Sequence, residues 1–331
     1  MVKLRIALSA VISIAVLYLV FSRIDAGDIY RMLTSVDKRF LLVFMLLSVT
    51  MSLFRVWRYL LLLDISGFRP SKIRLFLVVL ARNLCSDLLP ARLGSLVYIL
   101  LVTLKLGVSL PAATSSFALA FIFDLIAVVP LVIAALILGA SRIEAINSHM
   151  LLAASGTVLL LLVILLKFLP QIFGATAAVL SRSGTDILWI QRIQQTLTAS
   201  AEELKKASRA GVYLKVLLLS LIVRVSKYAS LYVFALALLI QHGIGIFDVN
   251  VESMFLAICS AEFAASLPVS GIAGFGAYEG TWMVAFKMLG FSSKLAALTA
   301  VSHHLFTQLW GYSLGVLAFI ILAALPAKKD K

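Results

Sequence analysis

The sequence predicts an all-α polytopic membrane protein that forms one integral membrane domain over residues 1–331. Hydrophobic residues make up 62% of the chain, and the mean hydropathy is +1.08. Apolar stretches of about 20 residues, long enough for a helix to cross a hydrocarbon core, recur along the chain. Two of the remaining segments place Pro and Gly between short apolar runs. No segment is long and polar enough to predict a separate soluble domain.

The first half of the predicted fold covers residues 1–140. Spans are expected at about residues 4–22, 41–63 and 111–139. The first span is interpreted as a retained helix, because no small-x-small cleavage site follows it in the stretch FSRIDAGD. Residues 75–107 read as two short apolar helices that are joined at a break containing Pro90 and Gly94.

The second half covers residues 150–325, with spans expected at about 150–169, 212–240 and 295–325. Residues 251–290 form a second pair of short apolar helices. The break of this pair contains Pro268, Gly271, Gly274 and Gly276.

A connector over residues 175–211 is expected to lie on the cytoplasmic surface and to contain an amphipathic helix. Apolar residues recur there at spacings of three and four, which places them on one helical face: Ile190, Ile193, Leu197, Ala201 and Leu204. Trp189 and several basic residues suit the headgroup layer. A role in regulation or partner binding is the alternative.

The two broken pairs share a sequence pattern. SDLLPARLGSLVYILLVTLKLGVS (86–109) and SLPVSGIAGFGAYEGTWMVAFKMLGFS (266–292) both run from Leu-Pro through glycine to a Leu-Gly-x-Ser turn. Each half has three crossings and one pair that returns the chain to its starting side, so the halves are expected to be inverted relative to each other. Inverted repeats with broken helices are typical of secondary transporters, whose substrates bind near the breaks.

The net charge is +14, and the distribution of the basic residues along the chain fits the positive-inside rule better than it fits nucleic-acid binding. With a cytoplasmic N-terminus, most lysines and arginines, among them Arg55, Arg58 and Arg69, are expected on inner loops and span ends. This distribution predicts that both termini are cytoplasmic. Cys85 and Cys259 lie in apolar segments without a CxxC partner, so no disulfide or metal site is expected. GFGAYEG lacks the third glycine of a dinucleotide motif and no Walker A motif occurs, so no cofactor is expected.

Ionisable residues at membrane depth are costly, so they are expected to face a shared cavity or one another. The glycines at the breaks let the backbone turn and approach closely. The predicted anion or lipid-headgroup residues are Arg82, Asn83, Arg92, Arg224 and Lys227, and the predicted proton or amine site comprises Asp87, Asp124, Glu262, Glu279 and His304.

These groups also have structural interpretations. For Arg82 and Arg92 the alternative to an anion site is pairing with Asp87 or anchoring at the inner membrane surface. Asp124 is a candidate structural partner of a cation such as Arg224. Glu279 would accept hydrogen bonds from the glycine-rich backbone. Of His303 and His304, only one is expected to serve the site, because adjacent helical side chains point about 100° apart.

At the two breaks the chain resembles the lysylphosphatidylglycerol-synthase transmembrane-region family of flippase-like membrane proteins. The first signature is matched by Asn83 and by Leu89, Pro90, Arg92 and Gly94, and the second by Leu267, Pro268, Gly274, Gly276 and Glu279. The chain departs from the family pattern at Ser95, Tyr98 and Phe121. The resemblance implies lipid translocation in a bacterial-type inner membrane. Lysyl transfer is not expected, because the family's aminoacyl-transferase domain is not found in the sequence.

The leading hypothesis is therefore a non-enzymatic flippase-like protein that moves a phosphate-bearing lipid or lipid-linked headgroup between leaflets. Membrane lipids are its expected partners. One alternative is a membrane-embedded transferase that acts on a lipid-linked substrate, with Asp25 or Asp28 at the outer face as acid or metal group. The other is a non-catalytic partner of a lipid-synthesising enzyme.

Overall fold

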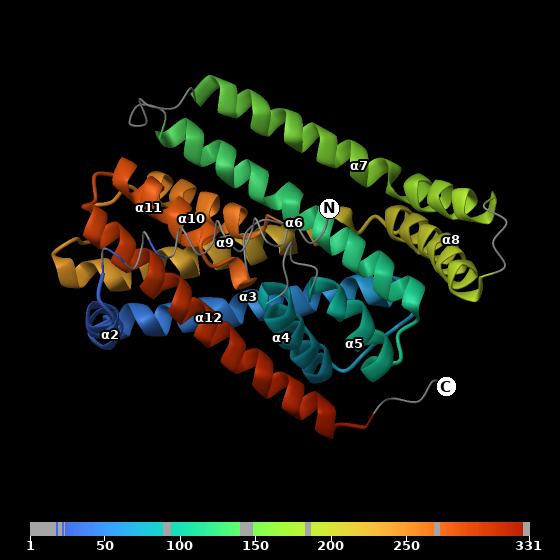
Figure 1. The fold of residues 1–331 in the computed structure, drawn as a ribbon. Coiled ribbons are helices and arrows are strands. Elements are labelled where there is room, and N and C mark those ends of the chain that lie inside the picture. Colours follow the sequence, from blue (N-terminus) through green and yellow to red (C-terminus); the bar gives the residue numbers. More distant parts are fainter. Residues whose placement is uncertain are drawn as a thin grey trace.

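The computed structural model describes residues 24–88, 94–139, 148–182, 187–267 and 272–326, together with Tyr18 and Ser22. Every regular element in these ranges is helical (Figure 1). Five of the described helices are long and apolar enough to cross a membrane. The predicted all-α polytopic class is therefore confirmed, whereas the predicted span at 4–22 lies almost entirely outside the described residues.

The long helices coincide with the strongest apolar runs. Asp37 and Ser292 cap two of them, since their side chains accept hydrogen bonds from the backbone N–H groups of Arg39 (2.9 Å) and Leu295 (3.3 Å). The bounds are α3 (Lys38–Ile65), α6 (Leu110–Gly139), α7 (Ser148–Arg182), α9 (Tyr213–Leu239) and α12 (Ser293–Ala324). For α3, α6, α9 and α12 the predicted spans are confirmed.

Helix α7 differs from the prediction. It continues through Pro170 to Arg182, so the expected end at residue 169 was wrong. At 1.5 Å per residue it is about 52 Å long, which exceeds a hydrocarbon core of about 30 Å. Its last turns therefore occupy the start of the predicted connector. The amphipathic helix of that connector is α8 (Leu188–Arg209), which lies against α7 and α6 and buries Ala201 and Leu204.

Four short helices form the two predicted pairs. They are α4 (Lys72–Leu88) with α5 (Val97–Leu106), and α10 (Val251–Ala265) with α11 (Ala277–Met288). The two pairs open toward opposite ends of the bundle in Figure 1, and α4 contacts the 3-10 turn η3 (Ile272–Gly274) that connects α10 and α11. The helix pairs are confirmed, and the inverted relation of the two halves stays a prediction. Pro90, Arg92, Pro268 and Gly271 lie outside the described residues.

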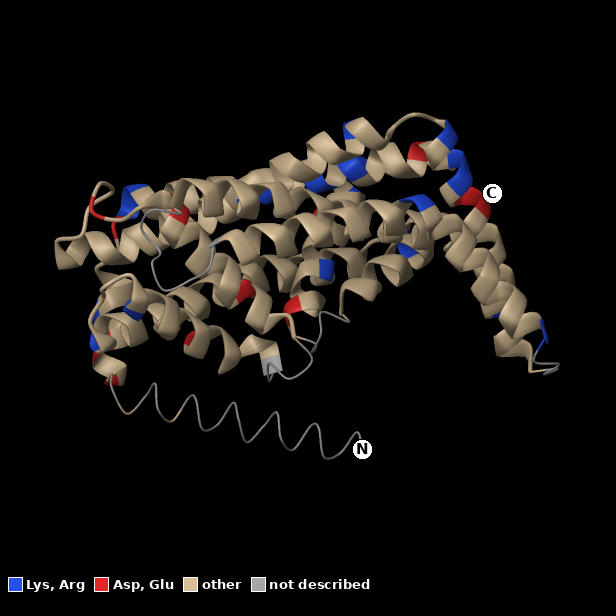
Figure 2. Cartoon of the chain, turned by 90° about the horizontal axis from the view of Figure 1, so that it is seen from above, with Lys and Arg blue, Asp and Glu red and all other residues tan. Residues whose placement is uncertain are grey.

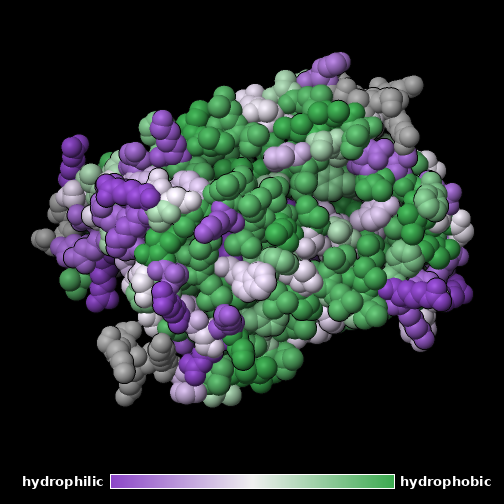
Figure 3. Space-filling model, turned by 180° about the vertical axis from the view of Figure 1, so that it is seen from behind, coloured by the Kyte–Doolittle hydropathy of each residue, from purple (hydrophilic) through white to green (hydrophobic). Residues whose placement is uncertain are grey.

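The bundle has two polar ends and an apolar middle. Figure 2 shows most charged residues near the ends, and Figure 3 shows a broad hydrophobic surface between them. At one end Arg74 donates a hydrogen bond to the carbonyl oxygen of Pro326 (3.3 Å), which joins α4 to the end of α12. At the other, the N–H of Asp37 donates to the carbonyl of Ala237 (3.4 Å). This arrangement is that of a multi-pass membrane protein.

Two break glycines are required by their surroundings. A Cβ at Gly94 would lie 1.6 Å from the carbonyl oxygen of Cys85, so only glycine lets the chain return this closely along α4. Gly276 has φ +93°, a conformation that side chains rarely adopt, and it precedes the first turn of α11. Both observations agree with the expectation that the break glycines let the backbone turn, as at Gly276, and approach closely, as at Gly94.

Gly311 and Gly315 form a GxxxG pattern on α12, and they provide a matched pair for testing helix packing. A Cβ at Gly315 would lie 2.4 Å from the Cβ of Leu84 on α4, whereas a Cβ at Gly311 meets nothing within 4 Å. We expect Gly315→Ala to destabilise the protein by about 1–3 kcal/mol through overpacking. Gly311→Ala should leave stability unchanged or slightly raised. Thermal unfolding in detergent measures both, and equal melting temperatures would contradict this packing.

Candidate functional site

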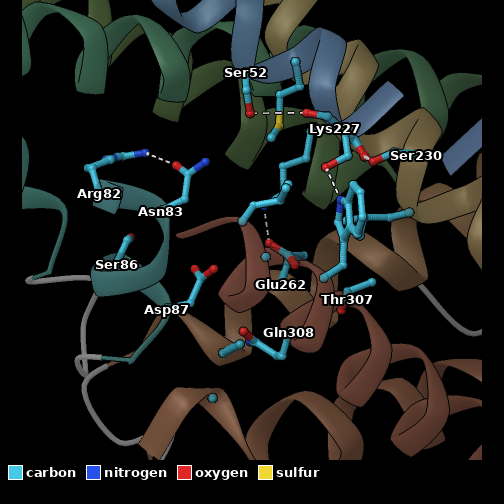
Figure 4. A pocket seen from close by; sticks show the side chains of 18 of the residues that line it. Ser52, Arg82, Asn83, Ser86, Asp87, Lys227, Ser230, Glu262, Thr307 and Gln308 are labelled. Atoms are coloured by element: carbon cyan, nitrogen blue, oxygen red, sulfur yellow. Dashed lines mark hydrogen bonds and ion pairs between the residues drawn. The ribbon is translucent and has the colours of Figure 1, made fainter. Parts of the chain in front are cut away.

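The two breaks meet at a partly open cavity of about 220 Å³. Residues of α3, α4, α6, α9, α10, η3, α11 and α12 line it, and Figure 4 shows several of the lining side chains converging on it. The lining includes nine residues predicted for the site: Arg82, Asn83, Asp87, Asp124, Arg224, Lys227, Glu262, Gly274 and His304. Residues distant in sequence are thus brought together as expected, although their function stays a prediction.

A buried ionic cluster forms one wall. Both carboxylate oxygens of Asp124 accept hydrogen bonds from Arg58, at 2.6 and 3.1 Å, and Arg58 also donates to Ser220 (2.8 Å). The Nε of Arg224 donates to the backbone carbonyl of Asp124 (3.0 Å) and lies 3.5 Å from its carboxylate. Arg224 is therefore a partner of Asp124, as expected, but Arg58 makes the shorter contacts.

The assignment of Arg58 and Arg55 to an inner span end was wrong. Arg58 is 0% exposed and Arg55 is 7% exposed, and both point into the bundle from α3. The reason is the rotation of α3, because residues three apart share a helical face and this face meets α4, α6 and α9. The signal in the sequence was the i,i+3 spacing of two arginines within an otherwise apolar run.

Arg55 and Arg82 approach the same amide. Arg55 Nη1 donates to Asn83 Oδ1 at 2.6 Å. Arg82 Nη1 donates to the same oxygen at 3.2 Å (Figure 4). Arg55 comes from α3, whereas the other two residues are neighbours on α4. Two predicted headgroup residues thus form a cluster with an arginine that was expected at an inner span end.

Lys227 and Glu262 form an ion pair across the cavity between α9 and α10 (Figure 4). Each side chain keeps a little under one-fifth of its surface exposed, so the pair borders the cavity and is not sealed in the core. Asp87 extends from the end of α4 toward the same space (Figure 4). Both signs of charge are therefore present at the meeting point of the breaks.

Glu279 lies behind the cavity wall. It is 0% exposed, and its carboxylate accepts hydrogen bonds from the N–H of Gly276 (2.7 Å) and from Nδ1 of His304 (2.5 Å). The first of these is the structural interaction that the sequence offered as the alternative to a proton site. His304 itself lines the cavity, and its Nε2 lies 3.0 Å from Nε2 of Gln308. A chain of polar contacts thus joins Glu279 to the cavity.

The adjacent His303 faces elsewhere, as the helical geometry predicts. Its Nδ1 lies 3.0 Å from the hydroxyl of Tyr278, and its Nε2 lies 3.0 Å from the carbonyl of Leu231. Among the two rings, only that of His304 lines the cavity.

Several lining residues were not anticipated from the sequence. They are short or uncharged polar side chains, which do not stand out in a hydropathy profile: Ser48, Ser52, Ser230, Thr307, Gln308 and Trp310. Only Gln308 carried a usable signal, since it follows His304 by one helical turn.

Asp28 is poorly suited to act as a general acid. On α2 (Ala26–Thr34), its carboxylate pairs with Lys294 (2.9 Å) and Arg31 (2.5 Å). These hydrogen bonds, above all that from Lys294, hold the pKa of Asp28 below its usual value, so the group stays ionised. Within the described parts of the chain, no group of three His, Cys, Asp or Glu residues is arranged to hold a metal ion.

Comparison with known proteins identifies the family of the chain. The family model for the lysylphosphatidylglycerol synthase TM region matches residues 6–315, which includes both breaks and every described residue of the cavity. A comparison with curated proteins gives no match. The family match extends over nearly the whole chain, so this protein belongs to the lysylphosphatidylglycerol synthase TM-region family.

Proposed function

We propose that the protein moves a phosphate-bearing lipid, or a lipid-linked headgroup, between the two leaflets of the membrane. The observation that carries this proposal is the position of the cavity: it contains both signs of charge, and both helix breaks meet at it inside an apolar bundle. Charged groups at membrane depth are costly and usually mark a substrate or ion pathway. Broken helices near such a site are typical of transporters.

The size of the cavity supports transport of a headgroup with the acyl chains outside. Its volume of about 220 Å³ lies below the range of about 300–1,000 Å³ that is usual for sites enclosing whole drug-sized ligands. A polar headgroup would cross through the cavity while its tails remain in the bilayer. The cations would meet the phosphate, and Glu262 with the Glu279–His304 pair would bind an amine or exchange a proton.

We further propose that the protein resides in a bacterial-type inner membrane with both termini in the cytoplasm and that it performs no group transfer. The basic residues outside the bundle still favour this orientation after Arg55 and Arg58 are removed from the comparison. A lipid-synthesising enzyme that supplies the lipid is a proposed partner.

Reconstitution into vesicles tests the proposal. Purified protein should accelerate the exchange of a fluorescent phospholipid or polyprenyl phosphate between leaflets, as measured by quenching from the outside. Arg69→Gln, which removes a guanidinium that is exposed and paired with Asp64, serves as the control variant and should retain full activity. Exchange at the rate of protein-free vesicles, with correctly folded protein, would reject the proposed function.

A further inference from the structure

Two arginines that line the cavity, Arg55 and Arg82, differ in their partners from the other cations in or beside it. Arg58 and Arg224 contact the carboxylate of Asp124, and Lys227 contacts Glu262. By contrast, no carboxylate among the described residues lies within ion-pair distance of Arg55 or Arg82. Their shared partner is one neutral oxygen, Oδ1 of Asn83.

This arrangement leaves donors of both guanidinium groups unused. The Nε atoms of Arg55 and Arg82 are buried without a hydrogen-bond partner, and Nη2 of Arg55 reaches only the sulfur of Met51, at 3.8 Å. A buried donor without a partner costs about 1–3 kcal/mol, and more when it is charged. Two like charges that converge on one oxygen also repel each other. The pair therefore has both the need and the free donors for a bound anion.

The chemistry of the two side chains indicates which anion fits. A guanidinium group presents a planar fork that matches the oxygens of a phosphate. A tetrahedral phosphate carries enough oxygens to accept from both forks at once. The amide NH₂ of Asn83 adds a further donor, and Ser86 lies one turn further along α4 on the same wall (Figure 4).

We propose that Arg55, Arg82 and Asn83 form the anion subsite of the cavity and hold a phosphate group. The identification of this phosphate as part of a lipid rests on the proposed function, whereas the subsite itself does not. Arg55 is the essential addition, because it brings the second guanidinium from α3 to the two residues of α4. Bound phosphate would bridge these helices and relieve the repulsion between the two cations.

Asn83→Asp gives a test in which binding and stability change in opposite directions. The new carboxylate has nearly the same shape and would sit where both guanidinium groups already converge, so it would supply the missing negative charge permanently. We expect phosphatidylglycerol binding to fall about tenfold or more, since the anion would meet a neutralised site, while the melting temperature rises. Gln191→Glu adds the same charge on the exposed face of α8 and should change neither quantity.

Native mass spectrometry of the purified protein measures lipid binding. It compares dioleoyl phosphatidylglycerol with dioleoylglycerol, which has the same acyl chains but no phosphate. A second experiment compares the melting temperature of the protein with and without inorganic phosphate. Arg82→Gln is a second variant, and it should also weaken phosphatidylglycerol binding about tenfold. Stabilisation by inorganic phosphate that is lost in Asn83→Asp, without selective lipid binding, would support the subsite with a free anion as its ligand.

Phosphatidylglycerol binding that is equally strong in the wild type, Asn83→Asp and Arg82→Gln would overturn the subsite. So would a lower melting temperature of Asn83→Asp. If binding depends on these residues but the protein gives no leaflet exchange, the subsite stands and the translocation proposal fails. The two proposals are thus separated by independent measurements.

Discussion

Asp124→Ala should lower the free energy of unfolding by about 3–5 kcal/mol, which is the usual cost of breaking a buried ion pair from one side. The substitution leaves the guanidinium of Arg58, which is 0% exposed, without either of its carboxylate contacts. Arg224 loses its nearest negative charge as well. Thermal unfolding in detergent, followed by the loss of monodisperse protein, provides the measurement.

Two companion variants identify the cause. Adding Arg58→Met to Asp124→Ala should recover a substantial part of the lost stability, because the buried charge that remained is removed too. Glu202→Gln breaks an exposed ion pair with Lys205 on α8 and should have little effect. If the double variant were no more stable than Asp124→Ala alone, the loss would come from packing at Asp124 and not from the unpaired charge.

Glu279→Ala and Glu279→Gln should separate the structural role of this residue from its proposed role in transport. Alanine leaves the N–H of Gly276 and Nδ1 of His304 without their acceptor, and each unsatisfied buried group costs about 1–3 kcal/mol. Glutamine should keep most of the stability. Its oxygen can accept from Gly276, and its NH₂ can donate to Nδ1 of His304 once the ring proton moves to Nε2.

Gln308, the third residue in this series of polar contacts, allows the hydrogen bond between residue 279 and His304 to reverse its direction. Oε1 of Gln308 is buried without a hydrogen-bond partner, so rotation of that amide would present an acceptor to a protonated Nε2 of His304. Glu279→Gln therefore removes only the negative charge, and we expect leaflet exchange to fall about tenfold or more. Exchange at the wild-type rate in a stable Glu279→Gln protein would assign Glu279 to capping of α11 alone.

Hydropathy predicted the described long helices well, except where polar residues lie inside them. The predicted bounds of α3, α6, α9 and α12 agree with the structure to within three residues at each end. The end of α7 was missed because Lys167 and Pro170 read as a stop, whereas a membrane helix tolerates both when the apolar run continues. The Pro/Gly breaks predicted both helix pairs, because glycine and proline disfavour a continuous helix for local reasons.

The sequence predicted many of the residues that line the cavity, but it did not predict which of them contact one another. Ionisable residues in apolar segments identified seven of the nine predicted lining residues, since a buried charge has few alternatives to a cavity or a partner. Arg55 and Arg58 were missed because hydropathy does not report the rotation of a helix about its axis. The contact between Glu279 and His304 joins α11 to α12 across 25 residues, and a single sequence contains no signal for such a pair.

The position of α7 has a consequence for how the sequence can vary. No residue in its most apolar window is fully buried within the protein, so the outward side chains of that window are available to the surrounding lipid. Leucine, isoleucine, valine and phenylalanine satisfy that environment equally well, whereas α9 and α12 must fit particular neighbours. A saturation mutagenesis profile should be nearly flat along the outer face of α7 and steep along the other two helices.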